Sequence, residues 1–175
     1  MTQQRAPFLR KSVRLPAFDY ASNATYFVTI CTLNRESLFG DIAGDQMRLN
    51  ALGTIVEEEL CYFAELRAEL EHHHMVVMPN HLHGLQTITP AERSSPNASP
   101  IENIPETPDR GKLVRPPRSL GSFVAGFKST ATKRINEEQA LPGIPVWQRN
   151  YYEHTVRSEA SFQWIWDYIE HNPAR

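Results

Sequence analysis

Strand-like and helix-like hydrophobic patterns follow one another along the chain. Residues 25–32 are mostly β-branched or aromatic and predict a buried strand. The segments 72–78 and 81–88 predict two further strands, because a Pro-Asn pair suited to a tight turn separates them. The composition of residues 146–156 favours a fourth extended strand. These four segments together predict a β-sheet.

Three segments instead carry apolar residues at helical spacing. Residues 49–70 and a segment around 120–135 predict amphipathic helices. A last helix is expected to begin after Ser158, a suitable N-cap, and to end at Pro173. The order strand, helix, strand, strand, helix, strand, helix predicts an α+β fold: a ferredoxin-like sandwich with a central antiparallel sheet and helices packed on one face.

The length and composition of the chain predict one domain. A chain of 175 residues with 41% hydrophobic residues is typical of a single soluble domain, so we expect residues 1–175 to form one. A segment at about 89–117 is rich in Pro, Ser and Asn and predicts a flexible insertion. No stretch approaches the roughly 20 apolar residues of a membrane span, and the start of the chain has no apolar signal core. We therefore expect a cytoplasmic protein with no membrane partner.

Charge is segregated along the chain although the net charge is only −2. Residues 110–134 contain basic residues and no Asp or Glu, whereas residues 57–71 are rich in glutamate. Local basic surface matters more for phosphate binding than net charge does, although ordinary solvated faces explain the same pattern equally well. The candidate nucleic-acid-binding residues are Arg10, Lys11, Arg14, Arg115, Arg118, Lys128, Lys133 and Arg134.

His81 and His83 are the first candidates for chemistry. Side chains alternate along a strand, so both imidazoles are expected on the same side, where they could bind one metal ion. Alone, such a pair is more often a surface or packing feature. The triplet at 72–74 adds weight, because five of the seven histidines fall between residues 72 and 83. We interpret His72 and His73 as solvent-facing or hydrogen-bonding residues and leave the role of His74 open.

Tyr168 and Asn172 are the second pair of candidates. They lie four residues apart in the last predicted helix, so a phenol and an amide oxygen share one helical face. The two side chains could converge on one ion or phosphate. A tyrosine at the margin of an apolar face is nevertheless more often a packing residue.

Six segments of the chain carry a further signal in their order: RKSVRLPAFDY, YFVTICTLNRESLFGDI, VVMPNHLHGL, LGSFVAGFKSTATKRIN, VWQRNYYEHTVRSE and DYIEHNPAR. Together they resemble the REP-associated tyrosine transposases, relatives of the single-tyrosine HUH transposases of small bacterial insertion sequences. They cover most of the chain outside the insertion, and the chain ends directly after the last one, whereas relatives usually continue.

The resemblance implies a role for each candidate. His81 and His83 take the place of the His-hydrophobic-His metal ligands, Tyr168 that of the nucleophile, and Asn172 that of a third ligand whose type varies among relatives. It implies Mg²⁺ or Mn²⁺ as cofactor, of which Mn²⁺ tolerates imidazole better. The implied activity is cleavage and rejoining of single-stranded or hairpin-forming, REP-like palindromic DNA through a 5′-phosphotyrosine, by a monomer or a homodimer.

Other interpretations of the sequence remain open. Tyr151 and Tyr152 are rival nucleophiles, but they match a segment that is not catalytic in the family, and together with Trp147 they could instead stack on bases. One alternative function is a non-catalytic, ferredoxin-like nucleic-acid-binding module. Another is a metallohydrolase that uses the histidines and a water nucleophile.

Overall fold

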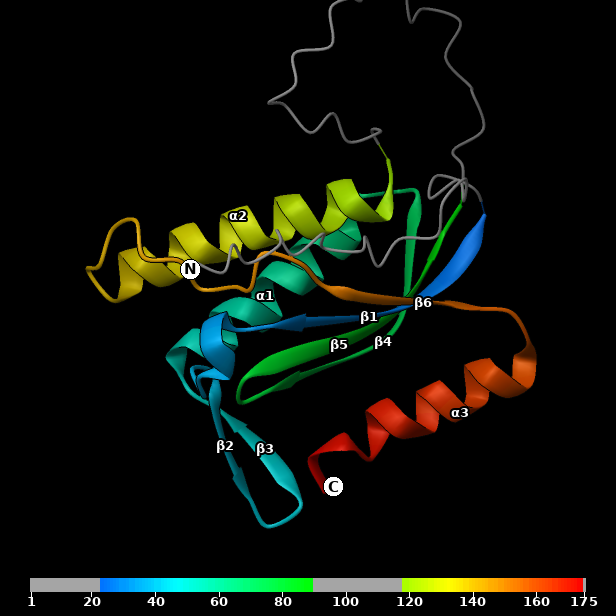
Figure 1. Cartoon of the computed structure of the whole chain (residues 1–175), viewed down its shortest axis with the longest axis horizontal. Helices are drawn as coiled ribbons and strands as arrows, with labels where there is room; N and C mark the ends of the chain where they lie inside the picture. The colour runs from blue at the N-terminus through cyan, green and yellow to red at the C-terminus, as the bar shows by residue number, and fades with distance from the viewer. Residues whose placement is uncertain (1–22, 90–117, 175) are drawn as a thin grey trace, which may run out of the picture.

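The protein has a ferredoxin-like fold. The computed structural model describes residues 23–89 and 118–174. Its central elements follow one another as β1 (Ala24–Cys31), α1 (Ala51–Leu66), β4 (Leu70–Met78), β5 (His81–Ile88), α2 (Leu120–Glu138) and β6 (Tyr152–Val156). The strands form one antiparallel sheet in the order β4-β5-β1-β6 (Figure 1). This βαββαβ arrangement confirms the predicted α+β class.

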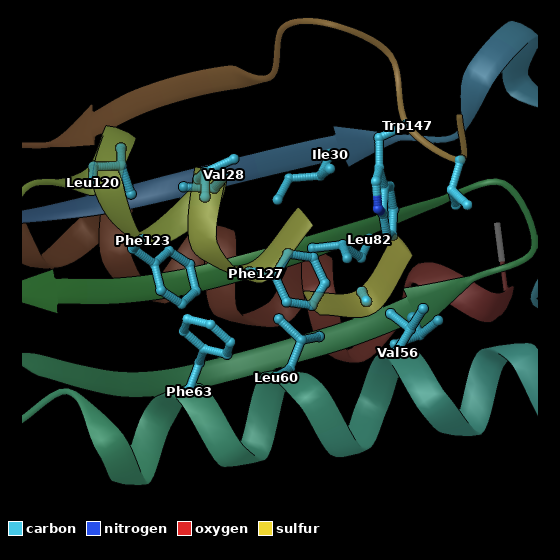
Figure 2. Packing of buried hydrophobic residues seen from close by; sticks show 14 of the residues in the cluster. Val28, Ile30, Val56, Leu60, Phe63, Leu82, Leu120, Phe123, Phe127 and Trp147 are labelled. Carbon is cyan, nitrogen blue, oxygen red and sulfur yellow. The ribbon is translucent and has the colours of Figure 1, made fainter. Parts of the chain in front are cut away.

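The main core lies between the sheet and the helices α1 and α2. Tyr26, Val28 and Ile30 alternate along β1 and bury their side chains on this side of the sheet. Phe63 of α1 meets Phe127 of α2 edge to face, with ring centroids 6.5 Å apart. Figure 2 shows Val28, Ile30, Phe63 and Phe127 packed with neighbours from both helices and from the sheet. Burial of this apolar surface is the main contribution to the stability of the fold.

The helix α3 (Glu159–Glu170) covers the other face of the sheet (Figure 1). Its Ile165 and Ile169 pack against Leu85 of β5, and Phe27 of β1 borders the same small cluster. The expected packing of helices on one face therefore holds for α1 and α2, and α3 adds a second layer. This second layer faces the odd-numbered residues of β1 and β5, because those alternate with the core residues.

Short elements surround one end of the sheet. They are η1 (Leu33–Arg35), the hairpin of β2 (Gly40–Ala43) and β3 (Gln46–Leu49), and η2 (Asn172–Ala174). The hairpin leads directly into α1, whose Gly53 lies against the preceding chain: a Cβ atom there would stand 2.1 Å from the Phe39 carbonyl oxygen. This close approach requires glycine and holds the start of α1 beside the end of the sheet.

The strand predicted at residues 146–156 is shorter than expected, since β6 begins only at Tyr152. Residues 146–148 run beside the chain that follows β1, and Leu33 N–H donates to the Val146 carbonyl at 2.7 Å. The next residues leave the sheet, and the Lys128 ammonium group of α2 donates to the carbonyls of Gln148 and Asn150 at 2.8 and 3.0 Å. In this segment the Lys128 side chain, and not a neighbouring strand, bonds to these backbone carbonyls.

The predicted insertion at about 89–117 lies, apart from Thr89, outside the described residues, and the assignment of residues 1–175 to one domain stays a prediction. Among the described helices, none combines the length and the apolar character that crossing a membrane requires.

Candidate active site

His81 and His83 lie on the α3 side of the sheet, at the start of β5. The residue between them, Leu82, points the opposite way and is buried in the main core. The two imidazole rings meet edge to face, with their Nε2 atoms 3.1 Å apart. His83 is almost fully buried, at 5% exposure. The strand periodicity therefore gives the side-by-side placement that the sequence predicts.

Each imidazole is held in place by a hydrogen bond at its second ring nitrogen, Nδ1. His81 Nδ1 lies 2.7 Å from Asn80 Oδ1, and His83 Nδ1 lies 2.9 Å from the Thr29 hydroxyl of β1. Because the amide oxygen Oδ1 only accepts hydrogen bonds, His81 carries its proton on Nδ1 and presents an unprotonated Nε2 in its neutral form. Such support is typical of histidines that bind metal ions through the other nitrogen.

The turn that precedes His81 is fixed by η1. Thr32 donates its hydroxyl to the Asn80 carbonyl at 2.9 Å, and the Asn80 side chain donates to the Arg35 carbonyl at 3.3 Å. Asn34 and Arg35 both have left-handed backbone conformations, with φ values of 55° and 59°. Such conformations are costly for residues other than glycine, and they are often found beside functional sites.

The environment keeps both histidines neutral. Burial, aided by the charge of Arg35, lowers the pKa of His81. Burial and the neighbouring His81 lower the pKa of His83 to about 3, against the opposing effect of a backbone hydrogen bond to Val28. A neutral imidazole offers a lone pair, which is the form that a metal ion binds.

Tyr168 reaches the same place from α3. Its hydroxyl lies 3.5 Å from His83 Nε2, although the two residues are separated by 85 positions in the sequence. The phenol ring also meets Phe27 of β1 edge to face, with centroids 6.0 Å apart. The predicted nucleophile and the two predicted metal ligands are therefore in one site.

Asn172, the predicted third ligand, is buried at 8% exposure at the first position of η2, one helical turn after Tyr168. No hydrogen bond among the described residues joins its side chain to His81 or His83. Nor does the described part of the chain hold three or more His, Cys, Asp or Glu side chains placed to bind one metal ion. A ligand set built on the two histidines would need an amide, a phenol, phosphate or water to complete it.

The predicted basic residues that the structure describes lie apart from this site. Lys128, Lys133 and Arg134 belong to α2, on the other side of the sheet, and Arg118 lies two residues before the start of that helix (Figure 1). The Arg134 guanidinium donates to Glu58 and Glu59 of α1 at 2.5 and 2.9 Å, so the acidic and basic segments pair with each other. Lys133 pairs with Glu137 at 3.8 Å. Arg10, Lys11, Arg14 and Arg115 lie outside the described residues.

The histidine triplet is divided between the two faces of the sheet. His72 is on the core side beside Phe123, where burial and His73 lower its pKa to about 4. A register shift between His72 and His74 breaks the alternation, and His73 and His74 both contact α3. His74 stacks on Trp166 and pairs with Glu170 at 2.8 Å. The solvent-facing interpretation of His72 is wrong, because the bulge reverses which residues point outward.

The aromatic candidates for base stacking lie in different environments. Trp147 is buried at 7% exposure and packs on Phe39 in the core. Tyr152 is 51% exposed on β6, where it pairs across Thr29 from His83. Trp164, which was not a candidate by sequence, is 66% exposed and stacks on Tyr168. Its position four residues before Tyr168 could have identified it, since residues i and i+4 of a helix are neighbours.

Comparisons with known proteins support a shared fold and identify a relative. No protein-family model matches the chain. The structure is similar to that of a REP-associated tyrosine transposase bound to a REP hairpin, with a TM-score of 0.56 and 17% identity over 99% of this chain and 73% of that one. A putative transposase from Deinococcus radiodurans gives a TM-score of 0.50 and 18% identity, over 90% of this chain and 95% of that one.

A protein of Haemophilus influenzae described as uncharacterized is 37% identical over 168 residues, which cover 94% of this chain and 88% of the relative. An identity of this size over nearly the whole length of both chains reflects common descent. The chain belongs to the same protein family as this Haemophilus influenzae protein.

Proposed function

We propose that the protein is a metal-dependent nuclease and strand transferase of the REP-associated tyrosine transposase type, which acts on single-stranded or hairpin-forming DNA. One observation carries the proposal: His81, His83 and Tyr168, from a strand and from the last helix, meet within hydrogen-bonding distance. The similarity in fold to two transposase structures agrees with it. The Tyr168 phenol lies 3.5 Å from Nε2 of His83, whose imidazole in turn contacts that of His81.

The donor set fits a divalent metal ion. Two Nε2 atoms that face each other at 3.1 Å suit a shared cation, which would accept a lone pair from each ring. Nitrogen ligands favour Mn²⁺ over Mg²⁺, which prefers oxygen. Asn172 remains our candidate for a third ligand, because it follows Tyr168 by one helical turn. When bound, the ion would supply Lewis-acid polarisation of a phosphate oxygen.

Tyr168 is the proposed nucleophile. Its phenolic oxygen forms a bond to phosphorus, the bond from phosphorus to the 3′ oxygen of the preceding nucleotide breaks, and the proton lost by the phenol is balanced by the one gained at the 3′ hydroxyl. The product is a 5′-phosphotyrosine. Attack by another 3′ hydroxyl reverses these changes and joins two strands without an external energy source. His83 and Phe27 orient the phenol for both steps.

The DNA partner is proposed on chemical grounds. A similar fold is known in a transposase bound to a REP hairpin. Near the site, the charge of Arg35 acts on His81, so the same guanidinium could attract a phosphate. The basic residues of α2 would contact DNA only where the strand passes the far side of the sheet. Whether a monomer or a homodimer acts stays a prediction.

The decisive experiment uses end-labelled single-stranded hairpin DNA with Mn²⁺ or Mg²⁺ and a denaturing gel. The wild type should form cleaved DNA and a covalent protein adduct, whereas Tyr168→Phe and the double variant His81→Ala, His83→Ala should form neither. Tyr152→Phe is the matched control, because Tyr152 is an exposed tyrosine on the same face of the sheet and a rival nucleophile by sequence. It should behave like the wild type.

Other results would favour other functions. Cleavage that persists in Tyr168→Phe would favour a metallohydrolase with a water nucleophile. Hairpin binding by the wild type without cleavage or adduct, in either metal, would favour a non-catalytic nucleic-acid-binding module.

A further inference from the structure

Trp164 is an exposed indole beside the proposed nucleophile. Its side chain is 66% exposed, the largest exposure of any large hydrophobic residue in the described part of the chain. Its ring lies nearly parallel to that of Tyr168, with an interplanar angle of 12° and centroids 5.8 Å apart. The two rings belong to successive turns of α3 and are neighbours along the helix.

Holding α3 in place does not account for this exposure. Trp166, two residues later, does contribute to the docking of the helix: it stacks on His74 at 4.7 Å and borders the small core around Leu85. Tyr168 in turn has Phe27 and His83 against its ring. Trp164 therefore leaves about two thirds of its surface outside while its neighbours complete the packing. An exposed indole at this place is available for a ligand.

The surroundings of Trp164 decide which ligand fits. The sequence of α3 contains Glu159, Asp167 and Glu170 and no Lys or Arg, so this helix does not attract phosphate. These acidic side chains do not repel an uncharged aromatic ligand that stacks on the indole. A broad protein interface also fits poorly, because exposed polar residues such as Gln163 and Asp167 flank the ring and interrupt the apolar surface.

We propose that Trp164 is the stacking site for the nucleobase next to the phosphate that Tyr168 attacks. This inference rests on the proposed function and deepens it. Base stacking on an aromatic side chain is tolerant of sequence and is a common way to hold single strands. The stack would place the sugar-phosphate chain toward His81 and His83 and away from the acidic surface of α3. Trp164 would thereby position the scissile phosphate and keep the phenol aligned.

The test measures binding of a fluorescently labelled single strand in the Tyr168→Phe background, where no cleavage occurs and the ring that stacks on Trp164 is kept. Trp164→Ala should weaken binding on the order of tenfold, and Trp164→Phe should restore most of the loss. Tyr62→Ala is the matched control: Tyr62 is an exposed aromatic, at 55%, on α1 across the sheet, and its loss should change nothing. Thermal unfolding should show that all variants are folded.

A second readout assigns the base. In a series of strands, each with one abasic position, the Tyr168→Phe protein should lose affinity on the order of tenfold at one position beside the cleavage site. Addition of Trp164→Ala should make binding insensitive to that position, because the two changes remove the same contact. The fluorescence of Trp164 should also fall when the intact strand binds.

The outcomes separate this inference from the proposed function. Equal binding with and without Trp164, or the same abasic profile in both proteins, overturns the stacking site while strand binding stands. A change in sedimentation mass in Trp164→Ala, with strand binding unchanged, overturns it in favour of contact between two copies of the chain. A complete lack of single-strand binding by the wild type overturns the inference and the proposed function together.

Discussion

The two faces of the sheet are packed in different ways. On one face, Tyr26, Val28 and Ile30 meet α1 and α2 in a continuous apolar core. On the other, the described residues form a small buried cluster of Leu85, Ile165 and Ile169 with partly buried apolar residues around it, and His83, hydrogen-bonded to Thr29, lies beside Tyr168. The same strand β5 supplies residues to both. With this division, the α1–α2 layer provides most of the stability, and the α3 layer holds the proposed catalytic groups at little cost to folding.

The largest expected effect comes from the core side. Phe127→Ala should lower the free energy of unfolding by about 3–5 kcal/mol, because the side chain is fully buried between α1, α2 and the sheet. Trp164→Ala, on the α3 side, should change it by about 0.5 kcal/mol or less. Denaturant unfolding measures both. Similar losses in the two variants would contradict the proposed division between the faces.

The next effect concerns metal binding on the α3 side. Mn²⁺ at a hundredfold excess over its dissociation constant should raise the free energy of unfolding by about 2.7 kcal/mol. The double variant His81→Ala, His83→Ala should lose this gain, and Asn172→Ala should reduce it if the amide is a ligand. Thermal unfolding with and without Mn²⁺ measures the effect. An equal gain in the wild type and the double variant would show that the metal binds elsewhere.

The third effect is the dependence of stability on pH in the metal-free protein. Burial lowers the pKa of His72 to about 4, so between about pH 6.5 and 4 the unfolded chain binds a proton there that the folded protein does not. The free energy of unfolding should therefore fall as the pH falls, by up to about 1.4 kcal/mol per pH unit for this group. His72→Gln should reduce the slope between pH 6 and 4.5, and the part that remains includes the contributions of His81 and His83, whose pKa values burial also lowers. An unchanged slope would mean that His72 does not stay neutral in the core.

The smallest effect concerns the docking of α3. His74→Ala removes the pairing with Glu170 and the stacking on Trp166. Because Glu170 is largely exposed, its contact with His74 contributes no more than about 1 kcal/mol, and we expect a comparable loss of stability. Glu137→Gln, which breaks the exposed pair with Lys133 on α2, is the control and should cost less. A larger loss in the control would contradict a special role for His74.

The sequence predicted most of the fold because the relevant signals are local. The alternation that sets β5, the helical spacing of α1 and the N-cap at Ser158 all act within a few residues, and the structure has these elements close to the predicted bounds. The hairpin of β2 and β3 was missed, because it is short and its exposed Ile42 gives little hydrophobic contrast. The apolar stripe of α3 shows that the helix buries a face, but it does not show which side of the sheet it covers.

The candidate site was predictable in part for the same reason. Periodicity brings His81 and His83 together, and family resemblance pointed to Tyr168. Thr29 and Asn80, which bond to Nδ1 of the two imidazoles, were missed, because these bonds depend on strand register and on the conformation of the turn before β5. The bulge at His73 was also missed, since one extra residue in β4 changes the face of the residues around it without any signal in composition.

The most direct test of the central claim is mass spectrometry of protease-digested protein after reaction with single-stranded hairpin DNA and Mn²⁺. The account predicts a nucleotide linked through its 5′ phosphate to the peptide that contains Tyr168, and to no other peptide. A nucleotide on the peptide that contains Tyr151 and Tyr152, or cleaved DNA without any linked peptide, would contradict it.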